Sequence, residues 1–149
     1  MKFKELLGMF KESASVSKSP NHLKSHMKNL LEIALVDEHF DETEMDLLKK
    51  LAQKYNISED ELGKIQDNPS TIEFQIPEDD NEKFEQFYEL VNMMTIDGKI
   101  LDEEMNLCVL IGKKFEYNNV RDVIDTLIQD IKTGLPMENT RNSVDWLLH

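Results

Sequence analysis

The sequence predicts an all-α protein, a helical bundle of two pseudo-repeated helical hairpins with short peripheral helices at its two ends. Its composition supports helices, because 149 residues include only 5 Gly and 4 Pro while 32% are charged. The repeat supports the hairpins, because residues 37–47 recur without a gap as residues 97–107. Apolar positions flanking the two segments also match at the same offset of sixty residues, as Leu51 with Ile111 and Tyr55 with Phe115.

Size and charge narrow the classes of partner. A chain of 149 residues is large enough for one domain with a core that needs no disulfide or structural metal. Its net charge of −13, without a visible Lys/Arg cluster, argues against nucleic acid and against anionic membranes. The single cysteine, Cys108, occupies the position of Leu48 in the other repeat, which predicts a core residue. With no secretory leader pattern at the start, we expect a cytoplasmic protein.

We divide the chain into three parts. Residues 1–20 combine an amphipathic helix, with Phe3, Leu6, Leu7 and Phe10 on one face, and a Ser-rich connector. Docking of this helix on the bundle or on a partner is the favoured interpretation, since the net charge opposes membrane binding. Residues 21–136 form the helical domain, and residues 137–149 form a short C-terminal helical segment that either packs on the core or meets another subunit.

The first half of the domain should contain three helices. One begins near Asn21 and runs to the first bend with an apolar face, and the next restarts at Asp41. Ser58 and Glu61 form a capping box for a third helix that starts near Glu59 and ends near Asp67. Residues 71–77 alternate apolar and polar side chains, and we expect an extended linker that lays Ile72, Phe74 and Ile76 on the bundle.

The second half of the domain should repeat the helix–bend–helix unit and then add a further helix. A helix should open near Asp80, followed by the second bend and a helix that carries the repeated apolar face. Asn119 with Asp122 should cap another amphipathic helix, which Gly134 and Pro136 end.

The bends carry the candidate site, formed by Asp37, Glu44, Asp97 and Glu104. Capping explains the two glutamates, since a carboxylate in the first turn of a helix is stabilised by the helix dipole and by free amides. It does not explain the two aspartates, which follow a helix C-terminus, where negative charge is mildly unfavourable. Either a turn hydrogen bond or a shared divalent cation, calcium or magnesium, would offset that cost.

Other site motifs are weaker. An EF-hand is rejected, because its first and third loop positions would fall on Met93 and Thr95, which supply no carboxylate. His22 and His26 lie four residues apart and read as a solvated pair rather than a zinc site. His39, in the first bend, is a candidate for pH-sensitive modulation. Nucleotide-binding loops and nucleophile elbows are absent from the sequence.

Residues 22–133 resemble the tellurite-resistance TerB-like family. The resemblance rests on an Asp followed seven residues later by Glu at each bend, after helices that end in 34–37 and 94–98. It implies an all-helical bundle, a metal site at Asp37, Glu44, Asp97 and Glu104, and a role in stress response or as an adaptor. The chain departs from the family pattern at Glu38, where Gly is expected, and at Leu101, where Asp is expected.

From these observations we expect a non-enzymatic cytoplasmic binding or adaptor module that takes a protein partner, with a divalent cation as a candidate modulator. Two alternatives remain open at this stage. One is a hydrolase that uses the bend carboxylates and a metal to activate water. The other is a structural oligomer assembled through the two ends of the chain.

Overall fold

The computed structural model describes residues 21–36, 42–96 and 98–148, and all regular structure within them is helical. The elements are α2 (Asn21–Leu35), α3 (Glu42–Lys54), α4 (Glu59–Asp67), the 3₁₀ turn η1 (Pro69–Thr71), α5 (Asp80–Thr95), α6 (Asp102–Lys114), α7 (Val120–Lys132) and α8 (Met137–Leu148). The prediction of an all-α protein is confirmed.

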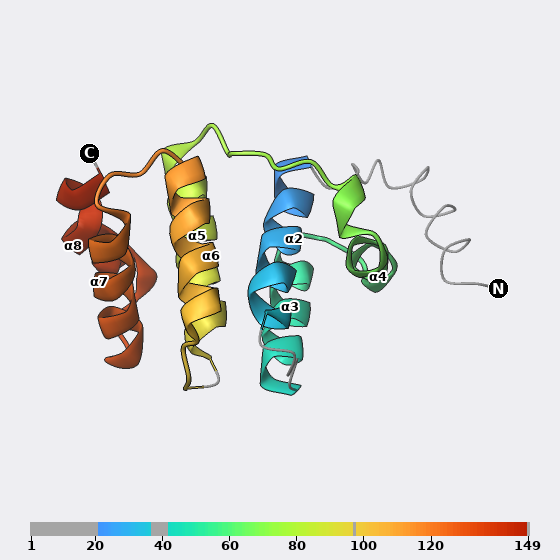
Figure 1. Cartoon of the computed structure of the whole chain (residues 1–149), viewed down its shortest axis with the longest axis horizontal. Helices are drawn as coiled ribbons and strands as arrows, with labels where there is room; N and C mark the ends of the chain where they lie inside the picture. Colours follow the sequence, from blue (N-terminus) through green and yellow to red (C-terminus); the bar gives the residue numbers. More distant parts are fainter. Residues whose placement is uncertain (1–20, 37–41, 97, 149) are drawn as a thin grey trace.

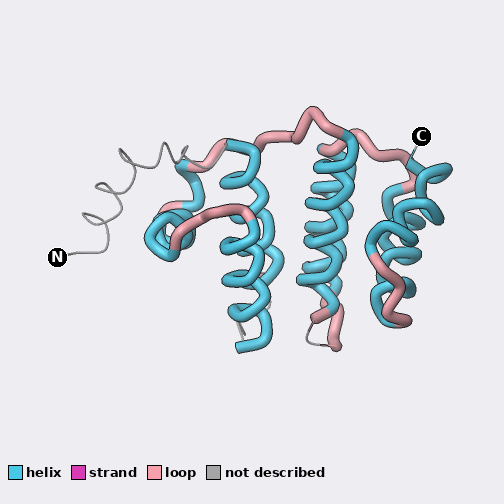
Figure 2. Tube along the Cα trace, turned by 180° about the vertical axis from the view of Figure 1, so that it is seen from behind, coloured by secondary structure: helices cyan, strands magenta, loops and turns pink. Residues whose placement is uncertain are grey.

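Two helix pairs form the centre of the bundle (Figure 1). α2 packs against α3 and α5 packs against α6, and the two pairs meet chiefly through α2 and α5. α2 and α5 run in the same direction, so both end at the lower side of Figure 1, where α3 and α6 begin. α4 flanks the first pair, and α7 and α8 flank the second pair on the opposite side of the molecule, as Figure 2 shows from behind.

Local chemistry explains several helix ends. Ser58 caps α4 by accepting a hydrogen bond from the Glu61 amide at 3.1 Å, as the capping box predicts. Asp79 caps α5 in the same way through the Glu82 amide. Asn119 differs from the prediction, because its side chain makes no cap hydrogen bond and instead donates from Nδ2 to the Leu147 carbonyl oxygen. Asn119 therefore ties the start of α7 to the end of α8.

The linker between the two halves is extended, as predicted. Ile72 and Phe74 pack partly against the core, whereas Ile76 is exposed, so the predicted contact of Ile76 is wrong. The Gln75 amide donates to Ser25 Oγ at 2.9 Å, which fastens the linker to α2. A backbone amide satisfied by a side chain lets this segment remain single-stranded without burying an unpaired donor.

One apolar core runs through the bundle. Its largest fully buried side chains include Phe87 and Phe115, whose ring centroids are 6.2 Å apart. Gly112 lets α6 approach this cluster, since a Cβ there would lie 2.5 Å from Val120 Cγ1. Cys108 is fully buried, as predicted, and burial raises the pKa of its thiol to about 12. The cysteine thus acts as a small core residue.

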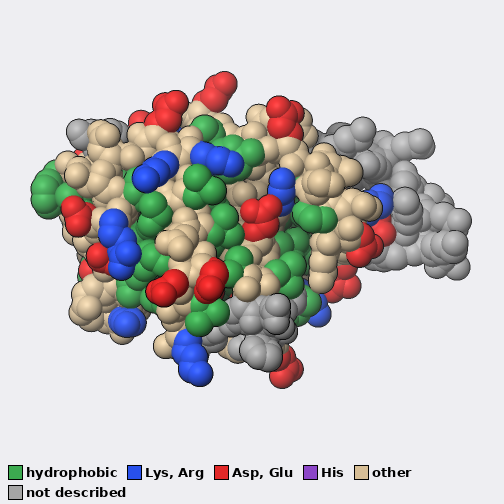
Figure 3. Space-filling view, viewed as in Figure 1, with side chains coloured by type: hydrophobic (Ala, Val, Ile, Leu, Met, Phe, Trp, Pro, Cys, Tyr) green, Lys and Arg blue, Asp and Glu red, His purple; other side chains and the backbone are tan. Residues whose placement is uncertain are grey.

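The C-terminal helix packs on the bundle through Val144, Leu147 and Leu148, while Trp146 is 74% exposed. Residues 1–20, including the predicted amphipathic helix, lie outside the described residues. Within the described part of the chain, no helix combines the length and apolarity needed to cross a bilayer. Figure 3 shows Lys/Arg and Asp/Glu side chains intermingled over one face, with apolar side chains between them.

Candidate functional site

Glu44 and Glu104, the two predicted site residues that the structure describes, lie in matching environments. Each is in the first turn of its helix, α3 or α6, and each is 2% exposed. Glu104 Oε1 accepts a hydrogen bond from the Leu101 amide at 3.0 Å, which is the reciprocal half of a capping box. At this bend, therefore, the capping interpretation of the glutamate is confirmed.

Asp37 and Asp97 lie outside the described residues, as does His39. Among residues 21–36, 42–96 and 98–148, no group of three or more His, Cys, Asp or Glu side chains is arranged to hold a metal ion. Calcium takes about six to eight oxygen ligands, so one described glutamate at each bend falls well short of such a shell. The cation hypothesis thus depends on the two aspartates and stays a prediction.

A second polar cluster, the α2–α5 seam, lies between the two halves of the bundle. It comprises His22 and His26 of α2, Glu82, Glu85 and Glu89 of α5, and Lys54 and Tyr55 at the end of α3. His22 Nε2 lies 2.5 Å from Glu82 Oε1, and His26 Nε2 lies 2.7 Å from Glu89 Oε1. The prediction of a solvated histidine pair is therefore wrong: His26 is 0% exposed and His22 only partly exposed.

Glu89 is the centre of the seam. Besides His26, it accepts hydrogen bonds from the Tyr55 hydroxyl at 2.6 Å and from Lys54 Nζ at 2.7 Å. Burial alone would raise the pKa of Glu89, but the hydrogen bonds and charges of His26, Lys54 and Tyr55 outweigh it and hold that pKa below the ordinary value. A buried carboxylate with three donors is thus kept ionised by its partners.

Glu89 in turn shifts the pKa values of its neighbours Lys54 and Tyr55. Burial lowers the pKa of Lys54, but hydrogen bonds and charges from Glu85 and Glu89 overcome this and leave it above the ordinary value. Burial and the hydrogen bond to Glu89 both raise the pKa of Tyr55, so the phenol stays protonated as a donor. Glu89, Lys54 and Tyr55 therefore stabilise one another's protonation states.

Several polar atoms of α2 and α5 are buried without hydrogen bonds. In the described part of the chain, no hydrogen-bond partner is found for His26 Nδ1, Asn29 Nδ2 or either polar atom of the Gln86 amide. Such groups cost free energy relative to apolar side chains of similar shape. A seam of this kind contributes less net stability than an apolar interface of the same area would.

Sequence reasoning missed the partners of the histidines. The available signal was spacing: positions 22, 26, 29 and 33 and positions 82, 86, 89 and 93 both follow the four-three-four pattern of a helix seam. Polar residues occupy the first three positions of each set, on faces that are otherwise apolar. Two such polar series in helices of one bundle indicate that the helices face each other.

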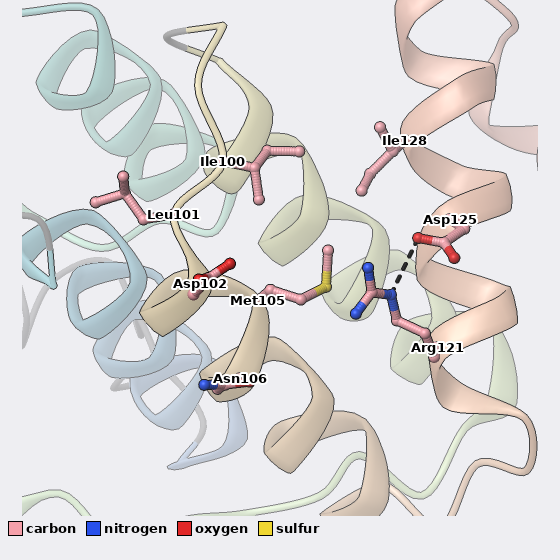
Figure 4. Close-up of a pocket in the computed structure, with 8 residues that line it drawn as sticks. All are labelled: Ile100, Leu101, Asp102, Met105, Asn106, Arg121, Asp125 and Ile128. Atoms are coloured by element: carbon pink, nitrogen blue, oxygen red, sulfur yellow. Dashed lines mark hydrogen bonds and ion pairs between the residues drawn. The ribbon is translucent and has the colours of Figure 1, made fainter.

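An open groove of about 580 Å³ lies beside the second bend, between α6 and α7 (Figure 4). Its lining residues are Ile100, Leu101, Asp102, Met105, Asn106, Arg121, Asp125 and Ile128. In Figure 4, Met105 points from α6 toward α7, and Arg121 Nε pairs with Asp125 Oδ1 at 3.2 Å along α7. Buried or half-buried apolar side chains and exposed polar or charged ones therefore line the groove together, its lining is more polar than apolar, and a carboxylate stands on each wall.

No protein-family model matches this chain, and it has no significant match among curated proteins or solved structures. The resemblance to the TerB-like family accordingly rests on the residues of the two bends alone.

Proposed function

We propose that this chain is a non-enzymatic helical binding module, an adaptor of TerB-like type, whose groove between α6 and α7 receives an apolar segment of a basic partner protein. The observation that carries the proposal is the composition of the groove. Ile100, Met105 and Ile128 offer apolar surface, while Asp102 and Asp125 stand on opposite walls. Protein-binding surfaces combine apolar and polar side chains.

Charge selects the class of partner. Asp102 is exposed on α6, and Asp125 is already paired with Arg121, so the groove carries one more negative than positive charge. The whole chain carries a net charge of −13, which attracts basic partners and accelerates their encounter. The fitting occupant is therefore a partner segment in which apolar residues are flanked by Lys or Arg.

The duplicated hairpin belongs to the same proposal, and several local details support it. α3 spans 42–54 and α6 spans 102–114, an offset of sixty residues. The hydrogen bonds that end the two helices recur at that offset, from the Ile57 amide to the Ala52 carbonyl and from the Tyr117 amide to the Gly112 carbonyl. Asn56 and Glu116 both have positive φ, at 58° and 64°. A duplication would account for these shared features of α3 and α6.

A binding experiment tests the groove. The probe is an amphipathic helical peptide of Leu and Lys, titrated by calorimetry into the full chain and into Asp102→Asn, Asp125→Asn and Asp122→Asn. Asp122 is an exposed residue of α7 that does not line the groove, so its variant removes the same charge elsewhere. We expect the two groove variants to bind several-fold more weakly and Asp122→Asn to bind like the wild type. Equal weakening in all three would mean that net charge alone attracts the peptide, and would overturn the proposal.

A divalent cation at the bends is the untested modulator in this proposal. Calorimetry with calcium, magnesium and manganese on the wild type and on Asp97→Asn/Glu104→Gln tests it, with Glu103→Gln as a matched control on the exposed side of the same helix turn. Heat in the wild type and the control, and its loss in the double variant, would support a cation site. If none of the three proteins gave heat on titration, the cation site would be refuted, and the adaptor proposal would then depend on the peptide experiment.

A further inference from the structure

Residues 1–12 of this chain have the composition that the groove between α6 and α7 favours. Their apolar side chains recur at helical spacing, as Phe3, Leu6, Leu7 and Phe10. Among these lie the three lysines Lys2, Lys4 and Lys11. Residues 1–20 hold four lysines and two glutamates, a charge of plus two, which leaves minus fifteen to residues 21–149. The segment, which lies outside the described residues, is therefore a basic apolar stretch joined to an acidic domain.

The charges of this segment also have a definite order around its axis. In the helix that the sequence predicts, with about 100° between successive residues, Lys2 lies about 90° to one side of the centre of the apolar face. Lys4 and Lys11 lie about 90 to 110° to the other side, whereas Glu5 and Glu12 lie about 150 to 170° away. Such a helix has lysines along both edges of its apolar face and carboxylates behind it.

The groove presents the complementary arrangement of charge. Each wall carries an exposed carboxylate, Asp102 on α6 and Asp125 on α7 (Figure 4). Arg121 already pairs with Asp125, so the groove keeps one more negative than positive charge. The apolar side chains that line it are those of Ile100, Leu101, Met105 and Ile128. A helix with lysines on both edges can therefore place its apolar face against these side chains and a lysine near each wall.

The connector is long enough for the segment to reach the groove of its own molecule. Residues 13–20 separate it from α2, and eight extended residues span about 26 to 29 Å. α2 begins at the end of the bundle opposite the bends, and its 15 residues span about 22 Å (Figure 1). α2 also packs directly on α6, one wall of the groove, and packed helix axes lie about 8 to 10 Å apart. A straight path from the start of α2 to the bend end of α6 is thus about 24 Å, within reach of the connector.

We propose that residues 1–12 dock as an amphipathic helix in the groove between α6 and α7 of the same molecule, so that a partner must displace them to bind. This inference rests on the proposed function, because it names the resident occupant of the same groove. A short connector gives the segment an effective concentration of about 1 mM. If the free segment binds with a dissociation constant of about 0.1 mM, the tethered one fills about nine-tenths of the grooves and weakens the binding of a free peptide about ten-fold.

Methyl spectra of the full chain test the docking directly. The reporter is the methyl group of Met105, which points from α6 toward α7 (Figure 4). The wild type is compared with Phe3→Asp/Phe10→Asp, which breaks the apolar face of the segment. Ser13→Asp/Ser15→Asp is the matched control, because it adds the same two negative charges to the connector and leaves that face intact. We expect the Met105 signal to shift in the Phe variant and not in the control, whereas a signal at one position in all three proteins would overturn the proposal.

A peptide titration separates failure of this inference from failure of the proposed function. The probe is a synthetic peptide of residues 1–12, titrated by calorimetry into the same three proteins. We expect Phe3→Asp/Phe10→Asp to bind it about ten-fold more tightly than the wild type and the control do, because no tethered segment fills its groove. Equal affinity for all three proteins would overturn the inference. If this peptide bound none of them while the Leu and Lys peptide still bound the groove, the inference would be refuted and the proposed function would stand, and failure of both peptides would refute both.

Light scattering distinguishes docking within one molecule from docking between two. We expect the wild type and Phe3→Asp/Phe10→Asp to have the same mass. A wild-type dimer that the Phe variant does not form would place the segment in the groove of a second copy, and would overturn docking within one molecule.

Discussion

Glu89→Gln should destabilise the protein more than any single charge-neutralising change on the surface. The substitution keeps the shape of the side chain but removes its charge, at a carboxylate whose exposed side-chain fraction is 6%. The bonds from His26 and Tyr55 become neutral, and hydrogen bonds to charged groups contribute about 1.5 to 3 kcal/mol each against about 1 kcal/mol for neutral ones. Lys54 is 44% exposed, so solvent screening discounts its pair with Glu89 to well under 1 kcal/mol.

Each of the two bonds thus loses about 0.5 to 2 kcal/mol, so the sum is about 1 to 4 kcal/mol. For a chain of this length, 1 kcal/mol corresponds to about 2 to 4 °C in the melting temperature, so Glu89→Gln should lower it by about 2 to 16 °C. Glu85→Gln is the matched control, because Glu85 has the same Lys54 and Tyr55 partners but is 30% exposed. Thermal unfolding by circular dichroism measures both. If Glu89→Gln costs no more than Glu85→Gln, the reasoning about the buried network is refuted.

Glu89 also affects how the free energy of unfolding changes at acid pH. Because the pKa of Glu89 is lowered in the folded state, its contribution is complete above the ordinary glutamate pKa of about 4.3 and is lost as the pH falls through the lower folded value. Stability of the wild type should therefore decline below about pH 4 more steeply than that of Glu89→Gln. Urea midpoints measured between neutral and acid pH would show parallel curves if this carboxylate were not linked to folding.

Three further predictions concern packing and capping. Gln86→Met should raise the free energy of unfolding by about 1 kcal/mol, because it removes two buried polar atoms that make no hydrogen bond in the described residues; a loss measured by urea unfolding would contradict this. Gly112→Ala should lower the free energy of unfolding by about 1 to 3 kcal/mol, because the new Cβ would lie 2.5 Å from Val120 Cγ1. Gly63→Ala, where a Cβ would meet nothing within 4 Å, should raise it by about 0.5 to 1 kcal/mol. Equal effects of the two substitutions in thermal melts would refute the packing argument. Ser58→Ala should cost about 1 kcal/mol through the lost cap of α4, and an unchanged melting temperature would show that the cap is dispensable.

Much of the fold could be predicted from local signals. The Ser58 capping box predicted the start of α4, and the amphipathic periodicity predicted α5 and α7. Cys108 was predicted to be buried because the repeat aligned it with Leu48, and both are fully buried. These predictions were correct because helix caps and apolar faces depend on residues that lie within one or two helical turns of each other in the chain.

The site could be predicted only in part. Capping by Glu104 follows from its place in the first turn. The spacing of polar residues in α2 and α5 indicates at most that the two helices face each other, and it does not assign His22 to Glu82 or His26 to Glu89. The groove has no local signature, since it exists because α6 and α7 meet at the second bend.

The sequence by itself determined the helical class, most helix boundaries and the position of the two acidic bends, because these depend on residues close together in the chain. The tertiary structure decided which polar faces meet. Only the parallel packing of α2 on α5 brings His26 to Glu89 and turns an expected solvated histidine into a buried member of the network centred on Glu89. The physical reason is that a side chain's charge and burial depend on its neighbours in space, which the periodicity of a single helix does not specify.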